Sequence, residues 1–174
     1  MSKLYVDEIH PKTSGKQVTR PELPSFMVGV NASYTHTSGN TIQFNTTDGT
    51  GGFDQGSNFD TSTYQFIAPV SGIYHFAGQV AYASGEETRR ADLWLKINGS
   101  TDYNARYRAR TNLDGTTTGG SSYLAITGHW TVKLDADDTV EWKANWETDG
   151  GSDGFDSTES VFYHGTYMSG HLVG

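Results

Sequence analysis

The stretch Tyr64-Gln65-Phe66-Ile67-Ala68-Pro69-Val70-Ser71-Gly72-Ile73-Tyr74-His75-Phe76 decides the fold class of this chain. Before a Pro-Val-Ser-Gly corner, Tyr64, Phe66 and Ala68 occupy every second position. After the corner, Tyr74 and Phe76 do the same. Period-two patterning of aromatic residues, interrupted by Pro and Gly, is typical of antiparallel strands joined at a turn. The stretch therefore predicts a β-sheet bent at a corner.

Strand-like runs continue from this stretch in both directions. The ten strands that we expect cover residues 26–30, 41–44, 60–68, 72–82, 92–97, 103–110, 122–134, 139–146, 161–167 and 170–173. Asn98-Gly99, directly after the run at 92–97, is a strong hairpin turn. Because no segment has a convincing helical period, we expect an all-β sandwich or barrel.

Composition and charge limit the class of protein. The chain has 174 residues, 21 of them glycine, an aromatic content of 13% and no cysteine. This length suits one all-β domain with an appendage, stabilised by an aromatic core or by oligomerisation. A net charge of −8 argues against nucleic acid as the main partner. The sequence has neither a run of about 18 apolar residues nor a signal-peptide core, so we expect no membrane insertion and assembly in a cytoplasm.

Residues 1–24 form a separate segment that holds three of the four prolines. Its apolar residues, among them Val6, Ile9 and Val18, are too few to fold alone. We therefore expect the segment to pair with copies of itself or to attach to another protein. The run Val6-Asp7-Glu8-Ile9-His10-Pro11 resembles short units near the start of bacteriophage tail-fibre and related virion proteins. This resemblance implies a partner that is itself a virion structural protein.

Residues 25–174 carry further landmarks in a fixed order around the opening stretch. They are Ser25-Phe26, Leu95-Lys96-Ile97-Asn98-Gly99, Leu134-Asp135-Ala136-Asp137-Asp138-Thr139-Val140 and Met168-Ser169-Gly170-His171-Leu172-Val173. With the Pro-x-x-Gly-x-Tyr-x-Phe centre, this order resembles the globular head of complement component one-q, a relative of the tumour-necrosis-factor jelly roll. Asp137 stands where that family has a turn glycine, and Met168 where it has a closing phenylalanine. The resemblance implies a ten-stranded antiparallel jelly-roll sandwich that forms a homotrimer.

Three tyrosines are candidates for the trimer interface. Tyr123, Tyr163 and Tyr167 fall on late strands, which in the resembled family line the threefold axis. The same residues would also suit an ordinary core within one domain. Both interpretations stay open from the sequence.

Arg106, Arg108 and Arg110 alternate along one expected strand. In a strand their guanidinium groups project from one face, about 6 to 7 Å apart. Such a stripe can bind anionic groups such as phosphate or uronic acid. Alternatively it pairs with acidic strands within or between protomers, with Glu141 and Glu147 as candidate partners.

Asp149, Asp153 and Asp156 lie in one glycine-rich loop. Oxygen-rich loops suit Ca²⁺, but the spacing fits no EF-hand, and a solvated turn is the alternative. Apart from this calcium candidate we expect no cofactor. The six histidines have no metal-ligand spacing.

The combined features predict a non-enzymatic bacteriophage virion protein, a fibre or spike whose trimeric head mediates adhesion to a host-surface glycan or protein. No Gly-x-Ser-x-Gly element is present, so no catalytic residue is assigned. One alternative is a head-decoration or fibre-assembly protein without a specific receptor. Another is a bacterial carbohydrate-binding module, which the missing signal peptide disfavours.

Overall fold

The computed structural model describes residues 23–47, 52–84, 88–100, 107–112, 122–148, 158–161 and 165–173. Over these ranges the chain forms twelve β-strands and no α-helix. The strands are β1 (Ser25–Gly29), β2 (Tyr34–Thr37), β3 (Phe53–Gln55), β4 (Phe59–Asp60), β5 (Gln65–Ile67), β6 (Gly72–Ser84), β7 (Thr88–Ile97), β8 (Arg108–Asn112), β9 (Ser122–Leu134), β10 (Thr139–Thr148), β11 (Thr158–Val161) and β12 (Tyr167–Leu172). No helix in the described ranges is long and apolar enough to cross a membrane.

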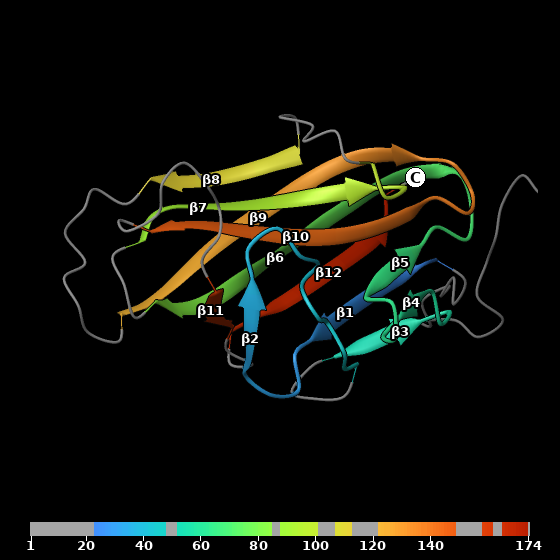
Figure 1. The fold of residues 1–174 in the computed structure, drawn as a ribbon. Coiled ribbons are helices and arrows are strands. Elements are labelled where there is room, and N and C mark those ends of the chain that lie inside the picture. The colour runs from blue at the N-terminus through green and yellow to red at the C-terminus, as the bar shows by residue number, and fades with distance from the viewer. Residues whose placement is uncertain are drawn as a thin grey trace, which may run out of the picture.

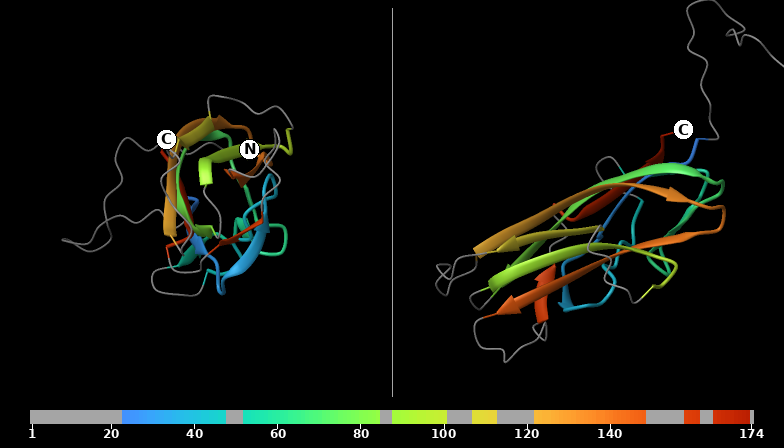
Figure 2. Two further views of the ribbon diagram at one scale, coloured as in Figure 1. Left: turned by 60° about the vertical axis from the view of Figure 1, so that its left-hand side comes forward. Right: turned by 90° about the horizontal axis from the view of Figure 1, so that it is seen from above.

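The strands form two antiparallel sheets that pack face to face (Figure 1). The first sheet has the order β2-β11-β6-β12-β1-β3, and β9 pairs with β6. The second has the order β4-β5-β10-β7-β8. The described chain begins and ends at the same end of the sandwich (Figure 2), where the Leu172 N–H donates to the Pro24 carbonyl at 3.0 Å. The all-β sandwich expected from the sequence is confirmed.

Aromatic side chains fill the space between the sheets. Phe26 of the first sheet stacks on Phe66 of the second, with ring centroids 4.9 Å apart, and Phe66 meets the edge of Phe76 at 5.7 Å. Farther along the core, Trp130 packs perpendicular to Trp142 at 5.3 Å. All five side chains are buried. The expectation that aromatic residues would supply the core is therefore confirmed.

The stretch of residues 64–76 follows its alternating pattern at every aromatic position except Tyr64. Phe66, Tyr74 and Phe76 point into the core, and the Tyr74 hydroxyl donates to the Val70 carbonyl at 2.7 Å, which closes the corner. Tyr64, however, has a positive φ of 62° and lies in the turn between β4 and β5. The expected strand at 60–68 is thus two short strands with a turn between them.

Two other expected strands are wrong, and one expected turn is correct. Residues 41–44 form only isolated pairings, although Ile42 is buried and its N–H donates to the Trp142 carbonyl at 2.8 Å. The expected run at 161–167 is interrupted by Gly165, whose φ of 86° places a turn directly before β12. Asn98 and Gly99 adopt φ values of 52° and 62°, and the Ser100 N–H donates to the Ile97 carbonyl at 3.1 Å, so the expected turn is present. It is not a two-residue hairpin between β7 and β8, because their register places Trp94 opposite Arg108.

The two departures from the resembled pattern are accommodated without change of fold. Asp137 has a φ of 70°, the left-handed region that favours glycine, in the exposed turn before β10. Met168 is completely buried between the sheets. The flexible methionine side chain fills the core position that a phenylalanine would occupy.

Candidate interaction surfaces

The outer face of the first sheet carries almost no charge. Side chains of its central strands alternate between core and exterior, as the pleat dictates. The outward positions of β1, β12, β6 and β9 define what we call the low-charge face: Ser25, Met27, Tyr167, Ser169, His171, Ile73, His75, Ala77, Gln79, Ala81, Ala125, Thr127, His129, Thr131 and Lys133. Lys133 is the only lysine, arginine, aspartate or glutamate in this set. In a chain with 32 such residues, this composition is unusual for a solvated surface.

Large exposed apolar side chains gather on the same face. Val173 continues β12 and donates its N–H to the carbonyl of Ile73 at 2.7 Å; the two side chains are 59% and 46% exposed. Leu23, 40% exposed, lies in the bend two residues before Ser25. Phe53 of β3, 47% exposed, pairs with Met27 of β1. Of the six large exposed apolar residues in the described ranges, Ile73, Val173 and Phe53 thus lie on or beside the low-charge face.

The outer face of the second sheet, in contrast, carries many ionisable side chains. Its outward positions on β7, β10 and β8 are Arg90, Asp92, Trp94, Lys96, Glu141, Lys143, Asn145, Glu147, Arg108 and Arg110. Eight of these ten side chains are ionisable and oppositely charged groups alternate, so we call this surface the charged face. Four of the ten, Asp92, Trp94, Glu141 and Asn145, are buried, and each of the two buried carboxylates is paired with a base, Asp92 with Arg110 and Glu141 with Lys96.

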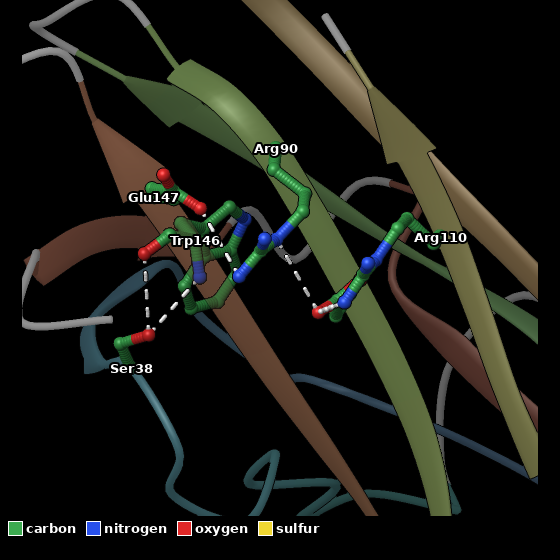
Figure 3. A network of polar contacts seen from close by, with 6 residues as sticks. Ser38, Arg90, Arg110, Trp146 and Glu147 are labelled. Carbon is green, nitrogen blue, oxygen red and sulfur yellow. Dashed lines mark hydrogen bonds and ion pairs between the residues drawn. The ribbon is translucent and has the colours of Figure 1, made fainter. Parts of the chain in front are cut away.

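A buried aspartate organises one end of the charged face (Figure 3). Asp92 is fully buried and accepts two hydrogen bonds from Arg110, at 2.6 Å from Nε and 3.0 Å from Nη2. Arg90 lies between the two carboxylates, with Nε 3.6 Å from Asp92 and Nη2 3.0 Å from Glu147. The bond to Asp92 raises the pKa of Arg110. The geometry is the bidentate fork that arginine and carboxylate prefer.

We expect Asp92→Asn to lower the free energy of unfolding by about 2 to 3 kcal/mol, because two guanidinium groups lose their shared buried counter-charge. Urea denaturation at neutral pH measures this loss. Glu147→Gln is the matched control: Glu147 is one-third exposed and paired at the surface with Arg90, so it should cost less than about 1 kcal/mol. Equal losses in the two variants would contradict the role assigned to Asp92.

Glu141 forms a second polar centre on the charged face. It accepts hydrogen bonds from Lys96 at 3.1 Å, Thr41 at 2.9 Å and Gln65 at 3.3 Å. Burial raises the pKa of Glu141, but these hydrogen bonds outweigh burial, and the pKa lies below its ordinary value. The acids suggested by the sequence as partners of the arginine stripe are therefore bound by other bases, Glu141 by Lys96 and Glu147 by Arg90.

His36 of β2 is the one buried histidine in the described ranges. Its Nε2 donates to the Ala144 carbonyl at 3.4 Å, its Nδ1 accepts from the Tyr34 hydroxyl at 3.3 Å, and its ring meets the edge of Trp146 at 4.9 Å. Burial lowers the pKa of His36 to about 4 and raises that of Tyr34 to about 12. The imidazole is thus held neutral inside the sandwich.

Stability should therefore fall with acidification. The folded state holds His36 neutral down to about pH 4, whereas the unfolded chain protonates it near pH 6.5. The unfolded state then binds more protons between these values, which lowers the free energy of unfolding by about 3 kcal/mol from pH 6.5 to pH 4. Urea denaturation across this range measures the effect, and His36→Gln should remove this component. An unchanged slope in that variant would show that other groups cause the acid sensitivity.

The structure places only some of the site residues expected from the sequence. Tyr167 is half-buried on the low-charge face, opposite Gln79. Tyr123 lies in β9 opposite Ala83, and its side chain is outside the described part. Arg108 pairs with Trp94 across β8 and β7. The remaining candidates lie outside the described residues: Tyr163, Arg106, Asp149, Asp153, Asp156, Val6, Ile9 and Val18.

Two other ligand classes find no site in the described ranges. No group of three histidine, aspartate or glutamate side chains there could hold a metal ion. All four tryptophans are at most 8% exposed, so none offers an open platform for a sugar ring. The low-charge face and the charged face are the features left as candidate functional surfaces in this part of the chain.

Comparison with known proteins supports the fold. No protein-family model and no curated protein matches the sequence. Among solved structures, the chain is similar to the globular domain of zebrafish complement 1qA, with 21% identity, a TM-score of 0.57, and coverage of 88% of this chain and 98% of the other. It is also similar to Eiger TNF from S. frugiperda, with 8% identity, a TM-score of 0.57, and coverage of 87% and 92%. The chain thus has the jelly-roll fold of these proteins.

Proposed function

We propose that the protein is a non-enzymatic structural protein of a bacteriophage virion. Its jelly-roll heads associate as a homotrimer through the low-charge face, and the trimer mediates adhesion to the host surface. The observation that carries self-association is the contrast between the two outer sheet faces. One is almost uncharged and holds three large exposed apolar side chains, and the other is dense with ions.

The composition of the low-charge face suits burial against a second copy. Burying a charge is costly unless it is paired, and this face has one charged side chain, Lys133. Alanine, serine and threonine also lose little side-chain entropy when an interface immobilises them. Ile73, Val173 and Phe53 would be withdrawn from water, each contributing about 1 to 2 kcal/mol. The chain has no cysteine, so association supplies stability that disulfides do not.

The virion role rests on residues 1–24 and their likeness to tail-fibre units. In this proposal Val6, Ile9 and Val18 contact another virion structural protein, and the heads face outward. Three weak receptor sites on one trimer then act together, because each bound site raises the effective concentration of the others. The fold's similarity to two non-enzymatic jelly-roll domains supports a binding role without catalysis.

Binding of the fluorescently labelled, purified protein to bacterial cells tests the adhesion proposal. We expect saturable binding to cells of the true host and none to unrelated bacteria. A monomeric variant with an altered low-charge face is the matched control, and it should bind with at least tenfold lower apparent affinity because multivalency is lost. Uniform absence of binding to the true host would contradict adhesion and favour a head-decoration or fibre-assembly role.

A further inference from the structure

Three of the four histidines in the described ranges share the low-charge face. His75 of β6 and His171 of β12 lie directly opposite each other, with ring centroids 5.6 Å apart. His75 Nδ1 is also 3.1 Å from the Thr131 hydroxyl of β9. His129 lies one row farther along β9, opposite Ala77. All three imidazoles are therefore within one small region of a surface whose other side chains, apart from Lys133, are neutral.

No carboxylate among the described residues faces these histidines. The neighbouring outward groups are Gln55 from β3, Ser25 and Met27 from β1, Tyr167 and Ser169 from β12, Ala77 and Gln79 from β6, and Thr131 and Lys133 from β9. Tyr167 and Lys133 are the only titratable groups among them, and Lys133 is a cation. Protonated histidines on this face would therefore add positive charge beside positive charge, without a counter-ion.

From this placement we infer that the low-charge face is a pH-responsive interface whose copies separate when His75, His129 and His171 become protonated. The inference rests on the proposed self-association. In the associated state the imidazoles are withdrawn from water, where an unpaired cation is strongly disfavoured. Imidazole changes its charge between about pH 5 and pH 8. The free protomer then binds more protons than the assembled one, and association weakens as pH falls.

Sedimentation velocity of the full chain at pH 7.5 and pH 6.0 tests the inference at constant ionic strength. We expect an oligomer at pH 7.5 and an increase of at least tenfold in the dissociation constant at pH 6.0. Far-UV circular dichroism at both values checks that the head stays folded. His36→Gln should dissociate as the unaltered chain does, which separates the interface from the acid sensitivity of the core.

Two variants identify the groups responsible. The triple variant His75→Gln, His129→Gln, His171→Gln should remain oligomeric at pH 6.0, because glutamine does not titrate. His171→Lys, which carries a permanent charge, should weaken association at pH 7.5 by at least tenfold. An oligomer unaffected by His171→Lys, or a triple variant that still dissociates on acidification, would overturn the inference.

The outcomes also separate this inference from the proposed self-association. A stable oligomer at both pH values, with unchanged folding, removes the pH response and leaves self-association standing. A monomer at both pH values at micromolar concentration removes both.

Discussion

Replacing Gly78 with valine should prevent the head from folding. Gly78 lies in β6 and faces the core, where a Cβ atom would meet the Tyr167 carbonyl oxygen, Met168 Cα at 3.0 Å and Trp142 Cη2 at 2.8 Å. Two of these three contacts are backbone atoms of β12, a strand held between β6 and β1, so they cannot move aside cheaply. We expect a loss of at least about 4 kcal/mol, a large fraction of the roughly 5 to 15 kcal/mol by which an ordinary domain is stable.

If the variant is soluble, urea denaturation followed by circular dichroism measures this loss. If it does not fold, we expect to recover the chain only from inclusion bodies. Gly99→Ala is the matched control, because a Cβ there meets nothing within 4 Å. It should cost only about 1 kcal/mol, from the positive φ of Gly99. A Gly78→Val variant as stable as Gly99→Ala would show that β6 and β12 are not packed as described.

Replacing Ala77, the residue before Gly78 in β6, with arginine should leave the head folded but prevent its association. Ala77 faces outward in the middle of the low-charge face, between Ser169 and His129. Ala77→Arg places a long cation where two copies would meet, so we expect a folded monomer with an unfolding free energy within about 0.5 kcal/mol of that of a dissociated wild-type protomer. Sedimentation velocity reports the mass, and near-UV circular dichroism reports the packing of the aromatic core.

Ala32→Arg makes the same chemical change in the exposed loop between β1 and β2 and should leave the oligomer intact. If Ala77→Arg also leaves it intact, the low-charge face is not the interface. If Ala77→Arg unfolds the head, then Ala77 does not face outward as the structure places it.

The sequence was sufficient for the parts of the fold that depend on local pattern. Alternation placed Phe66, Tyr74 and Phe76 in the core, and the Asn98-Gly99 dipeptide located a turn at the end of β7. Local pattern failed at Tyr64, where a positive φ ends the alternation. Aromatic residues are rare at positive φ, so nothing in their spacing could have revealed this turn.

Surface assignments depend on strand register, which a single sequence does not contain. His75 and His171 come from distant parts of the chain and meet only because β6 pairs with β12. Their spacing in the sequence predicts no shared site, although their alternation with the buried Tyr74, Phe76 and Gly170 marks them as outward.

The partner of Asp92 likewise could not be predicted from the sequence, because it depends on strand register. A carboxylate beside an apolar run suggests a solvated edge, yet Asp92 is fully buried and paired with Arg110 and Arg90. The arginine stripe suggested ion pairs with acidic strands, and Arg110 of β8 does pair with Asp92 of β7. It could not identify Asp92 as the partner, because that pairing follows from the β7–β8 register.

The native mass of the unaltered chain tests the central claim most directly. Sedimentation equilibrium at pH 7.5 and micromolar concentration should give three times the 19.0 kDa mass of one chain. A mass of 19.0 kDa at micromolar concentrations would contradict self-association through the low-charge face.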